Sequence, residues 1–181
     1  MAVKIAQKES VFLDANFLAG ISIPEHPDHV KAQKMLVWLL VNECNMKTSM
    51  LCIYELLGVV RKVQNRIRGN RPGIRKINTI LEKLSFSGIT LKLVFNKINF
   101  SYKAISGNID VTVNSLQSGG YISFSKLDHL HLPRALEGIK NYGLAPGDAF
   151  HLSVMENDGL KKIITADKDF KKTKLTPVSF K

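Results

Sequence analysis

Four acidic residues of the sequence stand where polar groups that carry out chemistry are often found. Asp14 and Asp167 each follow a short apolar run typical of a buried strand. Glu55 and Asp148 each lie in the early part of a stretch with helical spacing of apolar residues. Where strands alternate with helices, the functional crevice lies outside the carboxyl ends of the strands. We therefore expect the four carboxylates to face one edge of a single sheet, since hydrophobic patterning by itself requires none of them.

Carboxylates brought together in this way repel, and each raises the pKa of the others unless a cation neutralises them. Mg²⁺ and Mn²⁺ prefer oxygen ligands, so such a cluster predicts one of these two ions as the cofactor. A bound ion of this kind can generate hydroxide, polarise a phosphate oxygen and stabilise a leaving oxygen. A single Asp after a strand is more often a turn residue or helix cap. The shared placement of the four acids favours the metal site and the hydrolysis of phosphodiester bonds.

The elements that must position these acids follow from hydrophobic spacing along the chain. The run 11–13 predicts a buried strand, and 14–16 a loop after it. A helix is expected from Pro27, which suits the first turn, and a second helix carries the apolar stripe that includes Ile53 and Leu56. Glu55 stands beside that stripe, near the start of its helix.

The middle of the chain has a different composition. Residues 65–73 are rich in Arg, Asn, Gly and Pro and predict an exposed turn or loop. Residues 74–84 have a helical pattern, and residues 89–95 look like a strand. Residues 98–116 predict a longer helix, but 109–113 fit an alternating strand equally well, and both interpretations stay open.

The last third of the chain returns to clearer signals. The pattern predicts a strand at 121–125, a helix at 130–142 ended by Gly143, a helix from Pro146 to about Asn157, and strands at 162–165 and 175–180, the last at the sheet edge. Asp148 then falls in a first helical turn, where the helix dipole favours an ionised carboxylate. Strands alternating with helices predict an α/β fold with a parallel sheet covered on both faces.

The charge of the chain points to a polyanionic partner. Among 181 residues there are 26 Lys and Arg but 15 Asp and Glu, which gives a net charge of +11. No acid occurs between Leu56 and Leu81, where a basic segment accumulates: Arg61, Lys62, Arg66, Arg68, Arg71, Arg75 and Lys76. Beside the helix that carries Glu55, this segment is well placed to bind a phosphate backbone. The competing interpretation is a solvated surface loop.

The cysteines, the histidines and the short apolar runs argue against a disulfide-linked protein, a zinc protein and a membrane-spanning protein. Cys44 and Cys52 form no zinc-ligand spacing and are interpreted as small buried hydrophobes, which favours a cytoplasmic protein without disulfides. The longest apolar run, 35–41, is far shorter than the roughly 20 residues of a membrane span. His151 shares a helix face with Asp148 but is interpreted as a structural residue. The other four histidines are expected at the surface, so we predict no zinc site.

Four segments, in this order, resemble the PIN-domain nucleases, and in particular the VapC-like toxins of toxin–antitoxin pairs. The segments are Val11-Phe12-Leu13-Asp14-Ala15-Asn16, Thr48-Ser49 leading to Glu55-Leu56-Leu57-Gly58, Tyr142-Gly143-Leu144 leading to Asp148-Ala149-Phe150-His151, and Ile163-Ile164-Thr165-Ala166-Asp167-Lys168-Asp169-Phe170. The resemblance implies that Asp14, Glu55, Asp148 and Asp167 bind metal and act in catalysis, with Asn16, Thr165 and Asp169 as supporting residues.

The same resemblance implies a three-layer fold and a metal-dependent endoribonuclease that forms homodimers and pairs with an antitoxin protein. We expect one domain over residues 1–181, in which residues 66–119 form an enlarged helical insertion, because 93 positions separate Glu55 from Asp148. This insertion leaves open a toxin or an RNA-processing nuclease. Outside the enzymes, the alternative is a PIN-like RNA-binding or assembly module whose acids no longer act.

Overall fold

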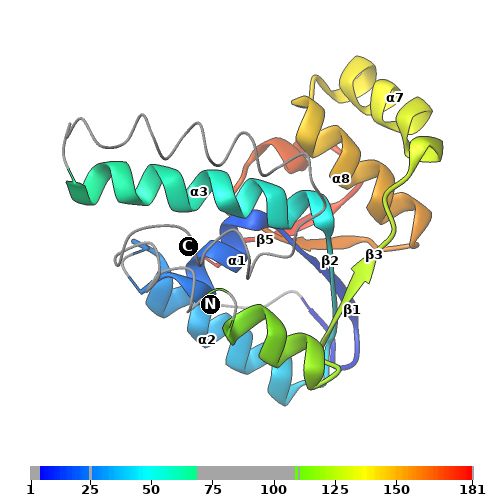
Figure 1. Cartoon of the computed structure of the whole chain (residues 1–181). Coiled ribbons are helices and arrows are strands. Elements are labelled where there is room, and N and C mark those ends of the chain that lie inside the picture. Colours follow the sequence, from blue (N-terminus) through cyan, green and yellow to red (C-terminus); the bar gives the residue numbers. More distant parts are fainter. Residues whose placement is uncertain (1–4, 25, 69–108, 110, 181) are drawn as a thin grey trace.

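The computed structural model describes residues 5–24, 26–68, 109 and 111–180, with the backbone alone over residues 60–68. Within this part of the chain, five parallel strands form one sheet that helices flank (Figure 1). In the sheet order β3-β2-β1-β4-β5, the strands are β3 (Ile122–Ser125), β2 (Asn45–Ser49), β1 (Ser10–Leu13), β4 (Lys162–Ile164) and β5 (Thr176–Val178). The predicted three-layer α/β fold is confirmed, and β5 lies at the sheet edge as expected.

The strand order explains which helices lie on which face. The chain steps outward from β1 to β2 and β3, then crosses back over both strands to β4. Because crossovers between parallel strands are right-handed, the two directions of travel place their helices on opposite faces. One layer therefore holds α1 (Ala15–Ser22), α2 (His29–Val41) and α3 (Met50–Arg68), and the other holds α7 (Leu132–Tyr142) and α8 (Pro146–Asn157) (Figure 1).

The central strand β1 is the most deeply buried part of the sheet. Val11, Phe12 and Leu13 have no exposed surface, and Phe12 pairs with Lys47 of β2 on one side and Ile163 of β4 on the other. A strand covered on both faces needs apolar side chains in both directions, which explains the unbroken apolar run. The direction of the chain reverses between β1 and β4, and this is the switch point at which α/β proteins bind ligands.

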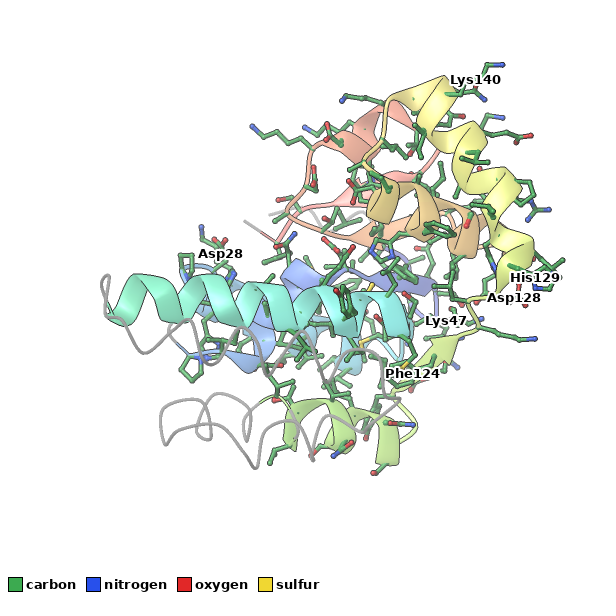
Figure 2. All side chains as sticks on the ribbon, turned by 45° about the horizontal axis from the view of Figure 1, so that its top comes forward. Asp28, Lys47, Phe124, Asp128, His129 and Lys140 are labelled. Carbon is green, nitrogen blue, oxygen red and sulfur yellow. The ribbon has the colours of Figure 1, made fainter. Side chains whose placement is uncertain are left out.

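The two helices of the second layer match the prediction except at one end: α7 begins at Leu132 instead of Leu130, because residues 129–131 form a separate 3-10 turn. Gly143 ends α7 with a left-handed backbone (φ 63°), and Pro146 occupies the first turn of α8. Helix α7 packs on α8 through small residues, since the Cα of Gly138 faces Ala149 and Leu152. Its outer side faces solvent, where Lys140 projects from the edge of the molecule (Figure 2).

Several predicted boundaries are wrong. Residues after Asp14 form α1 rather than a loop, because Asp14 has an extended backbone and its carbonyl accepts the first helical bond from Leu18 (3.0 Å). Residues 65–68 continue α3 rather than form a loop, since Arg66 and Arg68 favour helix and no Gly or Pro occurs from residue 65 until Gly69. Pro27 precedes α2 instead of lying in its first turn. The strand β2 was not predicted at all.

Some of the elements predicted for the middle of the chain fall on described residues, and others lie outside them. Residues 111–118 are helical, so the alternating strand considered for 109–113 is wrong there. The helix over 74–84 and the strand over 89–95 lie outside the described residues, as does most of the expected insertion 66–119. In the part of the chain that the structure describes, none of the helices is both long and apolar enough to traverse a membrane.

Substitution of two helical glycines, Gly20 and Gly58, should change stability in opposite directions. A Cβ added at Gly20 in α1 would lie 2.8 Å from the Cβ of Ala32 in α2, whereas one added at Gly58 in α3 meets nothing within 4 Å. We expect Gly20→Ala to lower the free energy of unfolding by about 1–3 kcal/mol through overpacking. We expect Gly58→Ala to raise it by about 0.5–1 kcal/mol through helix propensity. Urea unfolding of both variants checks this, and equal effects would contradict the described packing of α1 on α2.

Candidate metal centre

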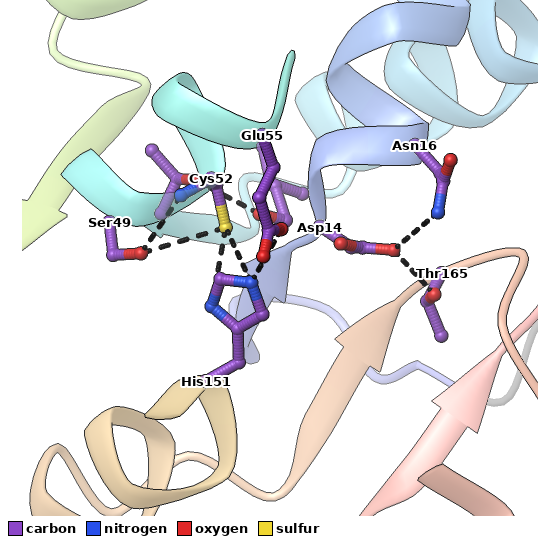
Figure 3. Close-up of polar contacts among 9 residues, drawn as sticks. Asp14, Asn16, Ser49, Cys52, Glu55, His151 and Thr165 are labelled. Atoms are coloured by element: carbon purple, nitrogen blue, oxygen red, sulfur yellow. Dashed lines mark hydrogen bonds and ion pairs between the residues drawn. The ribbon is translucent and has the colours of Figure 1, made fainter. Parts of the chain in front are cut away.

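Asp14 is the most buried acid of the predicted set. It follows β1 as the residue before α1, its side chain is 4% exposed, and its backbone N–H donates to the carbonyl of Ile164 in β4 (3.2 Å). Its Oδ2 accepts from the hydroxyl of Thr165 (2.6 Å) and from the amide of Asn16 (3.3 Å). Two of the three expected supporting residues, Asn16 and Thr165, thus contact Asp14 (Figure 3).

Three further carboxylates gather beside the start of α8. Asp148 in the first turn of α8 and Asp167 and Asp169 after β4 each offer an oxygen within 4.8 Å of the others. The backbone N–H of Asp169 donates to Oδ1 of Asp167 (2.8 Å), and Lys172 pairs with Asp169 (2.7 Å). This cluster contains oxygen ligands alone, which is the donor set that Mg²⁺ and Mn²⁺ prefer.

Thr165 joins Asp14 to this cluster. Its hydroxyl donates to Asp14 and accepts from the backbone N–H of Asp167 (2.9 Å). Thr165 is itself buried, with 1% exposure, so water does not compete for these two hydrogen bonds. The side chain of Thr165 therefore connects the acid that follows β1 with the acid that follows β4.

The acids affect one another electrostatically, as expected for charges that lie close together. The pKa of Asp148 is raised to about 6, first by burial and then by the charges of Asp167, Asp14 and Glu55, although His151 acts in the opposite direction. Burial also raises the pKa of Asp14, although its hydrogen bond from Thr165 favours the ionised form. A divalent ion would relieve both effects, so these residues fit the predicted cofactor.

Glu55 has a different environment from the three aspartates. Its Oε2 lies 2.8 Å from Nε2 of His151 (Figure 3). Its Oε1 lies close to where a Cβ on Gly147 would be placed. A side chain at position 147 would therefore force the carboxylate of Glu55 to move from its place beside the second position of α8. The carboxylate of Glu55 reaches the start of α8, next to Asp148, from a helix of the opposite layer.

His151 was interpreted from the sequence as a structural residue apart from the site, but it contacts a predicted site residue directly. It is fully buried, packs on the ring of Phe12 (centroids 5.7 Å apart), and lies 3.7 and 3.9 Å through its two ring nitrogens from the sulfur of Cys52. Burial lowers the pKa of His151, but Cys52 and Glu55 outweigh it, and this pKa lies well above 6.5. A charged imidazolium then balances the carboxylate of Glu55.

The lead-in to α3 explains how Cys52 and Glu55 are positioned. Thr48 at the end of β2 donates to the carbonyl of Leu13 (3.0 Å), which ties β2 to β1 beside Asp14. The hydroxyl of Ser49 accepts from the backbone N–H of Cys52 (3.3 Å) and so caps the start of α3. One turn later, Glu55 lies on the same side of the helix as Cys52, three residues away.

One further histidine differs from its predicted place, and the basic segment is described only in part. His131 is buried rather than at the surface, where it contacts Asp128 (3.1 Å) at the start of α7. The basic segment is not tested: the backbone of Arg61, Lys62, Arg66 and Arg68 lies in α3, but their side chains are not described, and Arg71, Arg75 and Lys76 lie outside the described residues.

The fold is thus a parallel α/β sheet with strand order β3-β2-β1-β4-β5, and the acidic cluster lies at its switch point. A model of the PIN domain matches residues 11–175, and the chain belongs to the PIN domain family. One similar solved structure is the crystal structure of Mycobacterium tuberculosis VapC20, described as a toxin that cleaves the sarcin–ricin loop. It shares 13% identity with a TM-score of 0.53, over 89% of this chain and 92% of that one. No curated protein matches.

The raised pKa of Asp148 predicts a specific dependence of stability on pH. Because the folded state holds the proton of this carboxyl more tightly than the unfolded state, ionisation costs stability as pH rises from about 4 to about 6. In chelator, we expect Asp148→Asn to unfold like the natural chain at pH 4. It should become more stable than that chain by about 1–2 kcal/mol above pH 6, allowing for solvent around the carboxyl.

Urea unfolding of both proteins at several pH values measures this difference. The exposed Glu43 supplies the control, because Glu43→Gln removes an acid far from the cluster and should give a difference that does not change over this range. A constant difference for Asp148→Asn as well would contradict the described environment of Asp148.

Proposed function

We propose that this chain is a metal-dependent endoribonuclease that uses Mg²⁺ or Mn²⁺. The observation that carries the proposal is the gathering of Asp148, Asp167 and Asp169 beside Asp14 at the switch point of the sheet. Membership of the PIN domain family supports nuclease activity in general. The choice of RNA over DNA rests on the resemblance to VapC-like toxins.

When bound, the ion would polarise a phosphodiester group and lower the pKa of a water molecule. Asp14, Asp148 and Asp167 are the residues proposed to hold it, since they provide oxygen ligands with little competition from cationic side chains. Thr165 and Asn16 orient the carboxylate of Asp14. Glu55 uses Oε2 toward His151, which leaves Oε1 beside Gly147 to orient a water molecule or contribute to metal binding.

The basic segment is proposed to hold the RNA backbone. It begins at Arg61, two turns after Glu55 on α3, and continues through Arg71, Arg75 and Lys76. Arg side chains give paired hydrogen bonds to phosphate oxygens, and the excess of 26 basic over 15 acidic residues supports a polyanionic substrate. Interleaved aromatic residues are absent from residues 61–76, so we propose backbone contacts rather than base stacking.

A role as the toxin of a toxin–antitoxin pair belongs to the same proposal. The similar VapC20 chain is described as a toxin, and it matches most of the length of this one. Leu132, Leu136 and Ile139 form an exposed apolar stripe along α7, which supports the expected contacts with an antitoxin or a second copy of the chain. The expectation of a cytoplasmic protein, which rests on cysteine content, accompanies this role.

Asp14 provides the sharpest test of the catalytic proposal. We expect Asp14→Asn to lower the rate of RNA cleavage in Mn²⁺ by at least about a hundredfold, the scale on which loss of one electrostatic contact to the transition state acts. RNA affinity should change little, because the basic segment is intact. Pure protein is incubated with labelled RNA with Mn²⁺ or with chelator, and the cut ends are mapped. Glu43→Gln is the matched control, and full activity of Asp14→Asn would end the proposal.

The basic segment makes a separate prediction about salt dependence. Reversing the charge of Arg66, Arg68 and Arg71 should weaken RNA binding and reduce the slope of log affinity against log salt by about 0.7 for each lost phosphate contact with a single strand. Reversing Lys31, Lys34 and Lys140, which lie on other helices, gives a control with the same change in net charge. If both triple variants lose the same slope, the basic segment has no special part in binding.

A further inference from the structure

A second group of ligands lies directly beside the oxygen cluster and differs from it in chemistry. A carboxylate oxygen of Asp14, the sulfur of Cys52 and a ring nitrogen of His151 lie within 4.8 Å of one another, and all three residues are buried. The carboxylate of Glu55 contacts the same imidazole (Figure 3). Sulfur, imidazole and carboxylate ligands together favour Zn²⁺ and similar borderline-soft ions over Mg²⁺.

We propose that Cys52 and His151, with Asp14 and Glu55, bind Zn²⁺ or a chemically similar ion at a site distinct from the oxygen cluster, and that this ion inhibits cleavage. The binding site stands on the geometry of the four side chains. Its inhibitory effect rests on the proposed function.

The separation of the ligands suits a tetrahedral ion. Bonds of about 2.3 Å to sulfur and about 2.0–2.1 Å to nitrogen set those two atoms about 3.5 Å apart. The sulfur of Cys52 lies 3.7 Å from Nδ1 and 3.9 Å from Nε2 of His151, so the ligands need to approach by only a few tenths of an ångström. Because the two distances are nearly equal, the sulfur lies along the lone pair of neither nitrogen, so the imidazole must also turn to bring one nitrogen to an ion held by the sulfur.

Glu55 would exchange its hydrogen bond with His151 for a bond to the ion. Its Oε2 is now 2.8 Å from Nε2 of His151, as suits a hydrogen bond. Two ligand atoms of a tetrahedral ion lie about 3.3 Å apart, so the carboxylate would move back by about half an ångström. The bonds to the metal form as the thiol proton of Cys52 and one imidazole proton of His151 pass to solvent.

The site is buried but can be reached. Cys52 and His151 have no exposed surface, whereas the side chain of Glu55 is 33% exposed and Asp148 is partly exposed. The partly exposed carboxylate of Glu55 is therefore the side from which we expect an ion to enter. Low exposure also protects the bound ion from water, which strengthens its interaction with charged ligands.

Inhibition follows from the shared acid. Asp14 belongs both to the mixed ligand group and to the charges that affect Asp148. An ion on Cys52 and His151 takes up the carboxylates of Asp14 and Glu55, so these two acids are no longer available to an ion held by Asp148 and Asp167. Zn²⁺ should therefore lower the affinity for Mg²⁺ and Mn²⁺.

Co²⁺ provides a direct probe of binding, because a thiolate ligand to Co²⁺ gives a charge-transfer absorption band that oxygen ligands do not give. We expect the natural chain to show this band with one Co²⁺ per chain, and Zn²⁺ to abolish it by displacement. Cys52→Ala should lack the band and lose at least about a hundredfold in Zn²⁺ affinity, the upper end of what altering the partner of a ligand costs. Cys44→Ala, which removes the other buried cysteine, should keep both properties.

Absence of the band in the natural chain, or its loss in Cys44→Ala but not in Cys52→Ala, would overturn the proposed site. If Cys52→Ala fails to fold, as judged by circular dichroism, His151→Gln decides, because it retains the cysteine but should weaken Co²⁺ binding by a similar factor. Unchanged Co²⁺ affinity in His151→Gln also overturns the site.

Cleavage assays then test the effect of the ion separately. With Mn²⁺ present, added Zn²⁺ should reduce RNA cleavage by the natural chain and by Cys44→Ala at least tenfold more than by Cys52→Ala, each relative to the same protein without Zn²⁺. Equal sensitivity of all three proteins would refute inhibition through this site. If the natural chain cleaves no RNA with Mn²⁺, the proposed function fails, whereas the Co²⁺ band still decides whether the site exists.

Discussion

Mutual repulsion among carboxylates at the carboxyl edge of the sheet is the constraint on which the site depends. Parallel strands all end at one edge, so the acids that follow β1 and β4 meet the acid that begins α8. Asp14 is 4% exposed there, where solvent does little to screen its charge. The hydroxyl of Thr165 stabilises that charge while also accepting the N–H of Asp167, so a single buried side chain keeps both acids in place.

The structure neutralises these acids in two different ways. Glu55 is balanced by His151, and Asp169 by Lys172, both through short contacts within the protein. Asp148 has no such partner among the described residues, and the pKa of its carboxyl is raised to about 6. Asp148, which has no cationic partner among the described residues, thus marks the position that suits a metal ion. Glu55 and Asp169, which have cationic partners, lie around that position.

The fold tolerates large differences in sequence. The chain shares 13% identity with the VapC20 structure and yet matches it over most of both chains. Such a likeness needs apolar residues at buried strand positions and a strand order that creates a switch point.

The residues themselves determined the alternation of strands and helices in the last third of the chain, the end of α7 at Gly143, the start of α8 at Pro146 and the position of Asp148 in its first turn. These features depend on spacing and on the backbone preferences of Gly and Pro, which are local. Helix α1 and strand β2 were missed, because each depends on contacts with distant elements more than on its own pattern.

Only the tertiary structure decided which side chains surround the acids. His151 and Cys52 lie 99 positions apart, on elements of opposite layers, and no spacing motif relates them. The crossover from β3 back to β4 brings α8 over the edge where α3 begins, and this places His151 on both Cys52 and Glu55. The sequence determined that acids would gather at the strand ends, because strand direction is a property of the fold class. Their individual partners depended on how two helices from separate parts of the chain pack across the sheet.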